Sequence, residues 1–152
     1  MKKLLLVCVL VVFGLMVGCA TTPTAVKEAP KYTFVIMPSK AIDVPVEGGQ
    51  KVTFNPSEVL KKALMAEYKD QAAFVDGTSG PSGAIIVEPR STDIWKRGPV
   101  VKEGVATGYV NKKWVAGYFG EMDGAISASD AKTKIEGAAE NFAKKVRFEI
   151  AP

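Results

Sequence analysis

The chain has 152 residues, with 20 Lys and Arg against 16 Asp and Glu and a formal net charge of +4 at pH 7. This balance lacks the strong basic excess of a nucleic-acid-binding protein, and we expect no nucleic acid as a partner. The sequence has no histidine and two cysteines, Cys8 and Cys19. These counts exclude Cys/His zinc sites, His-dependent nucleophiles and haem ligation by His. We therefore expect no cofactor and no metal ion.

The N-terminal segment has the pattern of an export signal. Lys2 and Lys3 make the start positive, and an apolar run follows over residues 4–17. Such a run is too short to span a bilayer, which takes roughly 20 residues, and it matches the apolar core of a signal peptide. The positive start favours the cytoplasmic side, so the sequence predicts export of the remaining chain.

Residues 15–19, Leu-Met-Val-Gly-Cys, resemble the lipobox of bacterial lipoproteins, in which a small residue precedes the lipidated cysteine. The family usually has Leu where this chain has Met16. The resemblance implies cleavage before Cys19, lipid on its thiol and anchoring in a membrane. Because Ala20 rather than Asp follows, it also implies the periplasmic face of the outer membrane. The alternatives are an ordinary signal peptide with an incidental cysteine and an uncleaved anchor helix.

The chain divides into three parts. Residues 1–18 are expected to be a removed signal peptide, and residues 19–30 the lipidated cysteine with a flexible tether that lacks any apolar period. Residues 31–152 suffice for one domain with a hydrophobic core, and not comfortably for two. Once Cys8 has left with the signal, the domain cannot contain a disulfide and must depend on packing.

In the first half of the domain, residue patterns predict strands bounded by turn residues. β-Branched and aromatic residues over 31–37 indicate a strand covered on both faces that ends at Pro38. The remaining expectations are a turn at 45–49, an extended piece at 52–54, a helix at 55–69 capped by Asn55, a strand at 72–76, a loop at 77–83, and a strand at 84–88 ended by Pro89.

In the second half, residues 104–119 predict a β-hairpin with its turn near Asn111 and Lys112. The glycines at 108 and 117 indicate a bulge or close packing. An apolar stripe from 131 to 146 then predicts a helix that begins at Ser127 or Ser129, and a short strand could follow at 147–150. These elements predict an α+β domain: a small, mostly antiparallel sheet with two amphipathic helices packed on one face.

Three patterns hint at catalysis, and each has a simpler interpretation. The glycine-rich loop 77–83 lacks the Lys-Ser/Thr that follows a phosphate-binding loop. Ser129 and Lys132 fit the Ser-x-x-Lys spacing of penicillin-binding enzymes, but the further motifs of those enzymes are missing, so the serine is read as a helix cap. The carboxylates Asp93, Glu121 and Asp123 are read as solvated. We expect no enzyme activity.

The segment 90–114 combines cations with aromatic side chains, a pairing that can bind anionic head groups, glycan strands or an acidic partner. The alternative is that Tyr109 and Trp114 belong to the core of the hairpin and the lysines are solvated. The candidate binding residues are Arg90, Trp95, Lys96, Arg97, Lys112, Lys113 and Trp114.

These features predict a membrane-anchored envelope lipoprotein that acts as a non-catalytic accessory or scaffold subunit of an envelope assembly. Its partners would be the membrane, through the N-terminal lipid, and an envelope protein. The alternative is a binder of anionic glycan or lipid through segment 90–114. The sequence does not indicate an oligomeric state.

Overall fold

The computed structural model describes residues 29–97, 101–122 and 125–150. The expected signal peptide and Cys19 lie outside the described residues, as do the side chains of Lys96 and Arg97, whose backbone belongs to a strand. Of the helices in the described part, none combines the length and apolar character needed to cross a membrane.

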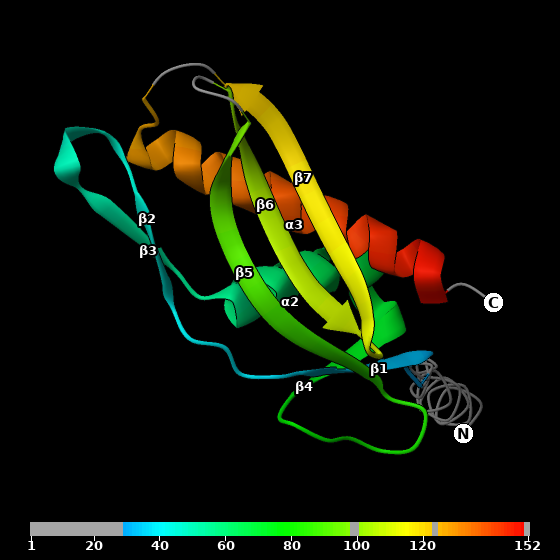
Figure 1. Ribbon diagram of the computed structural model, residues 1–152. Coiled ribbons are helices and arrows are strands. Elements are labelled where there is room, and N and C mark those ends of the chain that lie inside the picture. The colour runs from blue at the N-terminus through cyan, green and yellow to red at the C-terminus, as the bar shows by residue number, and fades with distance from the viewer. Residues whose placement is uncertain (1–28, 98–100, 123–124, 151–152) are drawn as a thin grey trace, which may run out of the picture.

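The domain has an α+β fold in which two helices cover one face of a five-stranded sheet (Figure 1). A separate two-stranded ribbon packs beside them. The elements are β1 Tyr32–Ile36, β2 Ile42–Pro45, β3 Lys51–Phe54, α2 Pro56–Tyr68, β4 Ala72–Asp76, β5 Ile85–Arg97, β6 Val101–Val110, β7 Lys113–Met122 and α3 Ala128–Ile150, with short 3-10 turns at Glu47–Gly49 and Lys69–Gln71.

The sheet is mixed, with strand order β4-β1-β5-β6-β7. β1 runs parallel to both β4 and β5, whereas β5, β6 and β7 form an antiparallel meander. "Mostly antiparallel" is therefore only approximate, because half of the pairings are parallel. The chain returns to the same end of the sheet twice, through α2 before β4 and through residues 77–84 before β5, so both strands run parallel to β1.

β1 is covered on both faces, as its composition predicts. Phe34 and Ile36 face the helices, and Val35 points the other way, yet all three are 0–1% exposed. The loop after β4 covers Val35, because Gly80 lies so close to it that a Cβ atom there would overlap the valine side chain. This loop therefore closes the second face of the strand.

The expectation that Pro89 ends its strand is wrong. β5 continues to Arg97, and the register shifts between Pro89 and Ser91 in a β-bulge. Proline cannot donate a ladder hydrogen bond, and a bulge is one of the few places where a sheet accepts it. Gly108 lies opposite, where a Cβ atom would be 2.8 Å from the carbonyl oxygen of Glu88.

Both helices begin where their capping residues indicate. In α2, the Asn55 side chain accepts a hydrogen bond from Ser57 N at 3.0 Å. In α3, Ser127 Oγ accepts from Asp130 N at 3.1 Å, which makes Ser127 rather than Ser129 the cap. The apolar faces of both helices join the β1, β5, β6 and β7 side chains in the main core, which includes Phe34, Leu60, Leu64, Tyr68, Val87, Ala106, Val115, Phe142 and Val146.

The short strand expected at 147–150 is wrong, because α3 extends to Ile150. Val146 and Ile150 continue the four-residue apolar spacing, and both contact the main core. Arg147 also forms an ion pair with Glu67 of α2 at 2.8 Å. These contacts favour helix over an extended end.

Glycines bring α3 directly onto the meander. A Cβ atom on Gly104 would overlap the backbone of Lys134, and one on Gly117 would overlap the carbonyl oxygen of Ala138. Conversely, Gly137 of α3 makes room for the Phe119 ring of β7. The close-packing interpretation of Gly117 is therefore confirmed.

The β2–β3 ribbon packs on the start of α3 and the far part of β5. Val44 and Phe54 are buried against Ile135, with Ile94 beside them. The predicted extended piece and turn are present, but β2 was not predicted. Its four residues include a single buried side chain, Val44, which leaves almost no periodic signal.

Candidate binding surface on the open face of the sheet

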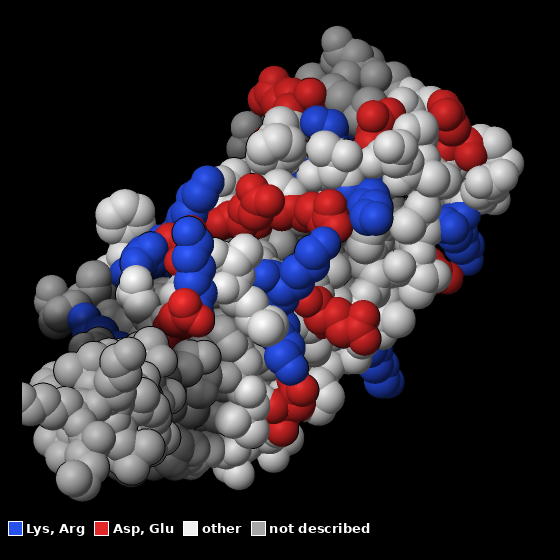
Figure 2. All heavy atoms as spheres, turned by 180° about the vertical axis from the view of Figure 1, so that it is seen from behind, with Lys and Arg blue, Asp and Glu red and all other residues white. Residues whose placement is uncertain are grey.

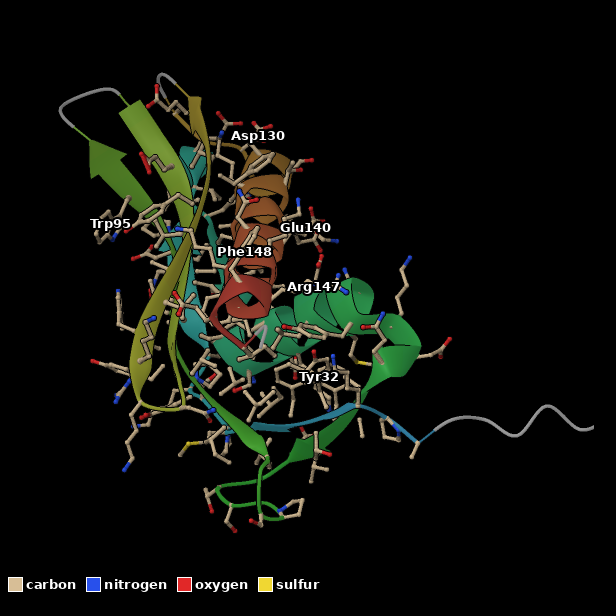
Figure 3. The ribbon with its side chains drawn as sticks, turned by 90° about the vertical axis from the view of Figure 1, so that its right-hand side faces the viewer. Tyr32, Trp95, Asp130, Glu140, Arg147 and Phe148 are labelled. Atoms are coloured by element: carbon tan, nitrogen blue, oxygen red, sulfur yellow. The ribbon has the colours of Figure 1, made fainter. Side chains whose placement is uncertain are left out.

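The helices leave one face of the β5–β6–β7 meander uncovered, and we call it the open face. Figure 3 shows Trp95 on the side of the sheet away from α3. Because directly paired residues of antiparallel strands point to the same face, the register identifies the rest of this surface. Its rows across the three strands are Trp95, Glu103 and Glu121; Asp93, Val105 and Tyr118; Ser91, Thr107 and Ala116; and Glu88, Tyr109 and Trp114.

An aromatic pair lies toward the end of the open face that is remote from the β6–β7 turn. The ring centroids of Trp95 and Tyr118 are 5.9 Å apart with an interplanar angle of 57°. Trp95 belongs to β5 and Tyr118 to β7, so their contact passes over β6. The β6 side chains beneath, Glu103 and Val105, are 6% and 0% exposed. Trp95 itself remains half exposed.

A second aromatic pair lies near the β6–β7 turn. Tyr109 and Trp114 meet edge to face, with centroids 5.1 Å apart. The guanidinium of Arg90 is 5.2 Å from the Tyr109 centroid and forms an ion pair with Glu88 at 2.7 Å. Tyr109 and Trp114 therefore do not belong to the core between sheet and helices, and Trp114 is 52% exposed.

The structure separates the cations of segment 90–114. Arg90 lies on the open face, but Lys113 pairs with Val110 on the opposite side and forms an ion pair with Glu149 of α3. Lys112 is exposed in the turn. The predicted binding residues Lys96 and Arg97 have side chains outside the described part of the structure.

The described open face is therefore aromatic and mixed in charge rather than basic. Arg90 shares it with Glu88, Asp93, Glu103 and Glu121. On the helix side of the molecule, basic and acidic side chains are likewise interspersed (Figure 2). Tyr118 is the residue that the candidate set lacked. The two-residue alternation of β7 places it on the face of Trp114, but its pairing with Trp95 depends on the three-strand register.

Another hollow, of about 720 Å³, lies at the carboxyl ends of β1 and β4. Several polar residues of its lining already have partners within the domain. Ser57 Oγ donates to the carbonyl oxygen of Met37 at 2.8 Å, and Lys61 Nζ lies 2.6 Å from Asp76 Oδ2. Among the described residues, no group of three or more Cys, Asp or Glu side chains is placed to hold a metal ion.

Comparisons with known proteins add little. No family model matches the chain, and no curated protein matches it. A solved chain described as "Crystal structure of uncharacterized protein" is similar over 82% of this chain and 95% of its own length, with 10% sequence identity and a TM-score of 0.38.

Proposed function

We propose that this protein is a lipid-anchored, non-catalytic accessory protein of the bacterial envelope, and that its open face binds a partner protein. The observation that carries the proposal is the half-exposed Trp95 on that face, whose ring contacts that of Tyr118. Trp, Tyr and Arg are the residue types that dominate binding hot spots in protein interfaces. The open face presents all three in Trp95, Tyr118 and Arg90.

The Trp95–Tyr118 pair is suited to be a binding anchor because it is already held in place. Tyr118 is fixed from the α3 side, where Asn141 Nδ2 donates to its carbonyl oxygen at 2.6 Å and Lys145 Nζ lies 5.4 Å from its ring centroid. A side chain that is ordered before binding loses less conformational entropy when a partner covers it. Removing such an anchor costs about 2 kcal/mol or more of binding free energy.

The envelope part of the proposal depends on the N-terminal sequence. The lipobox-like residues before Cys19 supply the anchor, and Ala20 favours the outer membrane. The tether to residue 30 reaches at most about 36–40 Å when fully extended. The partner would therefore lie close to the membrane that holds the anchor.

The second candidate is binding of an anionic glycan or lipid through segment 90–114. The exposed tryptophans and Lys112 favour it. Two of its cations, however, already have carboxylate partners within the domain, since Arg90 pairs with Glu88 and Lys113 with Glu149. Protein binding is therefore the better supported of the two.

The test is crosslinking in cells. A photo-crosslinking residue at Glu121, which is exposed in the same row of the open face as Trp95, should capture one protein in stoichiometric amount. Trp95→Ala should reduce that capture about thirtyfold, which corresponds to about 2 kcal/mol. The matched control is Met65→Ala, because Met65 is as exposed as Trp95 (49% against 50%) but lies on α2. Equal capture by both variants would contradict the open-face proposal.

The anchor is tested separately. Cys19→Ala should abolish lipid labelling and leave uncleaved precursor, because the lipidated thiol is what the processing peptidase of lipoproteins recognises. Normal cleavage of the Cys19→Ala chain would show an ordinary signal peptide instead.

A further inference from the structure

The start of the folded domain, the β6–β7 turn and the last turns of α3 lie at one end of the molecule (Figure 1). The pairing pattern fixes this arrangement. The first strand begins at Tyr32 and runs beside the start of β5, and Asn111 N in the turn donates to Ile86 O of β5 at 2.9 Å. Lys113, just after the turn, pairs with Glu149 near the end of α3. We call this region the turn end.

Two large apolar side chains project from the turn end. Phe148, near the end of α3 (Figure 3), is 84% exposed, and Trp114, at the start of β7, is 52% exposed. They line one groove of about 350 Å³ together with Ala116 and Lys145. Phe148 is the most exposed of the large apolar side chains in the described part of the chain. Because Trp114 and Phe148 line the same groove, they form one exposed apolar patch, and such patches mark interaction surfaces.

The turn end is also positively charged. Three of its carboxylates are each paired with a cation of the same end: Glu67 with Arg147, Glu88 with Arg90, and Glu149 with Lys113. The excess of positive charge comes from further cations at the start of β1, in the turn and on α3, namely Lys31, Lys112 and Lys145. The opposite charges of the neighbouring Lys69 and Asp70 cancel.

We propose that the turn end rests on the surface of an anionic phospholipid bilayer, with Trp114 and Phe148 at the depth of the head groups. Each Lys or Arg near an anionic surface adds to the attraction between the domain and the bilayer. Tryptophan favours the membrane–water boundary, and apolar side chains of peripheral helices lie at the edge of the acyl region. The proposal names the orientation of the domain and rests on the lipid anchor proposed above.

The position of the anchor favours a bilayer over a protein as the occupant of this surface. In the proposed arrangement the tether from Cys19 joins the domain at Lys31, so the lipid anchor is attached at the turn end. Trp95 pairs with Glu103 and Trp114 with Tyr109. These two partners are six residues apart on β6, about 20 Å at the rise of a strand. A domain held by its turn end therefore leaves Trp95 and the middle of the open face away from the lipid.

The two tryptophans provide the experiment. The chain contains two, so Trp95→Phe leaves Trp114 as the single tryptophan and Trp114→Phe leaves Trp95. Each mature, lipidated variant is reconstituted in vesicles of phosphatidylethanolamine with brominated phosphatidylglycerol. Brominated lipid should quench Trp114 fluorescence at least threefold more strongly than that of Trp95. The difference should shrink in vesicles whose only brominated lipid is phosphatidylcholine.

Charge reversal supplies the second arm. Lys31→Glu with Lys112→Glu should reduce Trp114 quenching by half or more, as should Phe148→Ser. The matched control, Lys51→Glu with Lys132→Glu, makes the same change of charge at two exposed positions on the β2–β3 ribbon and the start of α3. Circular dichroism confirms that each variant is folded. The proposal would be overturned if the two tryptophans were quenched equally or if the two charge reversals had equal effects. It would also be overturned if a protein ligand occupied the groove and lipid did not quench Trp114.

The experiment distinguishes a chain without the lipid anchor from a lipidated chain whose domain has another orientation. The mass of the N-terminal peptide shows whether Cys19 carries lipid. A lipidated chain with unquenched Trp114 overturns the orientation and leaves the proposed function standing. An unlipidated chain overturns the anchor, and quenching of Trp114 by the same vesicles then decides whether the turn end binds lipid by itself.

Discussion

Gly117 of β7 lies so close to Ala138 of α3 that a Cβ atom on the glycine would overlap the alanine carbonyl oxygen. The helix backbone cannot move away from this contact without opening the core beneath it, because Ala138 and the neighbouring Phe142 are both buried. The absence of a side chain at Gly117 is therefore a condition for the packing of α3 on the meander.

Replacing that glycine should destabilise the domain. Gly117→Ala should lower the free energy of unfolding by about 2–3 kcal/mol, the upper part of the range for overpacking. Urea denaturation measures the change. The control is Gly77→Ala, where a Cβ atom would have an ordinary contact of 3.7 Å with Ser79 O. Equal stability of the two variants would show that α3 is not seated on Gly117.

The β6–β7 turn contains a strained lysine. Asn111 and Lys112 have φ angles of 48° and 69°, as a type I′ turn requires. Only glycine adopts such values without cost, so Lys112→Gly should raise the free energy of unfolding by about 1 kcal/mol. Thermal denaturation would detect the gain. Lys112→Ala removes the same charge but keeps the Cβ atom, so a similar gain from alanine would contradict the conformational explanation.

Many local features of the fold can be predicted from the sequence. Asn55 followed by Pro56 predicts the start of α2, and Asn111 predicts the turn, because capping and turn chemistry act over a few residues. The failures involve partners distant in sequence. Nothing near Pro89 indicates that β6 supplies a glycine opposite a bulge, and nothing near Arg147 indicates the ion pair with α2 that favours continued helix.

The candidate site shows the same limit. Exposed aromatics and cations in segment 90–114 are visible in the sequence, and Trp95, Trp114 and Arg90 do lie on one face. Lys113 directly precedes Trp114 in a strand, however, so it points to the other face and meets Glu149. The packing of α3 decides which of the neighbouring residues face the helices. The composition of the segment does not encode that packing.

The hydroxyl of Tyr68 makes the stability of the domain pH-dependent. Burial of this side chain, which is 1% exposed, raises its pKa from 10.0 to about 12, partly opposed by the charge of Arg147. The folded state therefore holds this proton more tightly than the unfolded chain. Its contribution is fully present below pH 10 and is lost as the pH rises from 10 through about 12.

Tyr68→Phe should remove this loss. Between pH 9 and 12, the free energy of unfolding should fall by up to about 2–3 kcal/mol more in the wild type than in the variant. The hydroxyl has no hydrogen-bond partner among the described residues, so the substitution should cost little at pH 7. Urea denaturation at both pH values measures the difference. The control is Tyr109→Phe, which removes a hydroxyl from the open face and should show the same dependence of stability on pH as the wild type. If all three chains showed the same dependence, Tyr68 would not be its cause.

Side chains of α3 cover the outer edge of β7. Asn141 Nδ2 donates to Tyr118 O and Lys145 Nζ donates to Ala116 O, both at 2.6 Å. Exposed strand edges pair with other chains, and occupied carbonyls prevent this. Asn141→Ala should therefore lower stability by about 1 kcal/mol and increase self-association.

Light scattering against protein concentration tests this prediction. Glu140→Ala is the control, because Glu140 is the exposed neighbour of Asn141 on the same helix. If both variants remained as monomeric as the wild type, the hydrogen bond to Tyr118 would have no protective role.

β5 has a consequence for folding. Its first residues pair with β1 in the parallel part of the sheet, and its remaining residues pair with β6 in the meander. Loss of either pairing exposes the core that both share, so neither half should persist without the other. Far-ultraviolet circular dichroism and tryptophan fluorescence should therefore give coincident unfolding transitions. A domain that unfolds only as a whole offers proteases no partly open form in which one half is cut while the other survives.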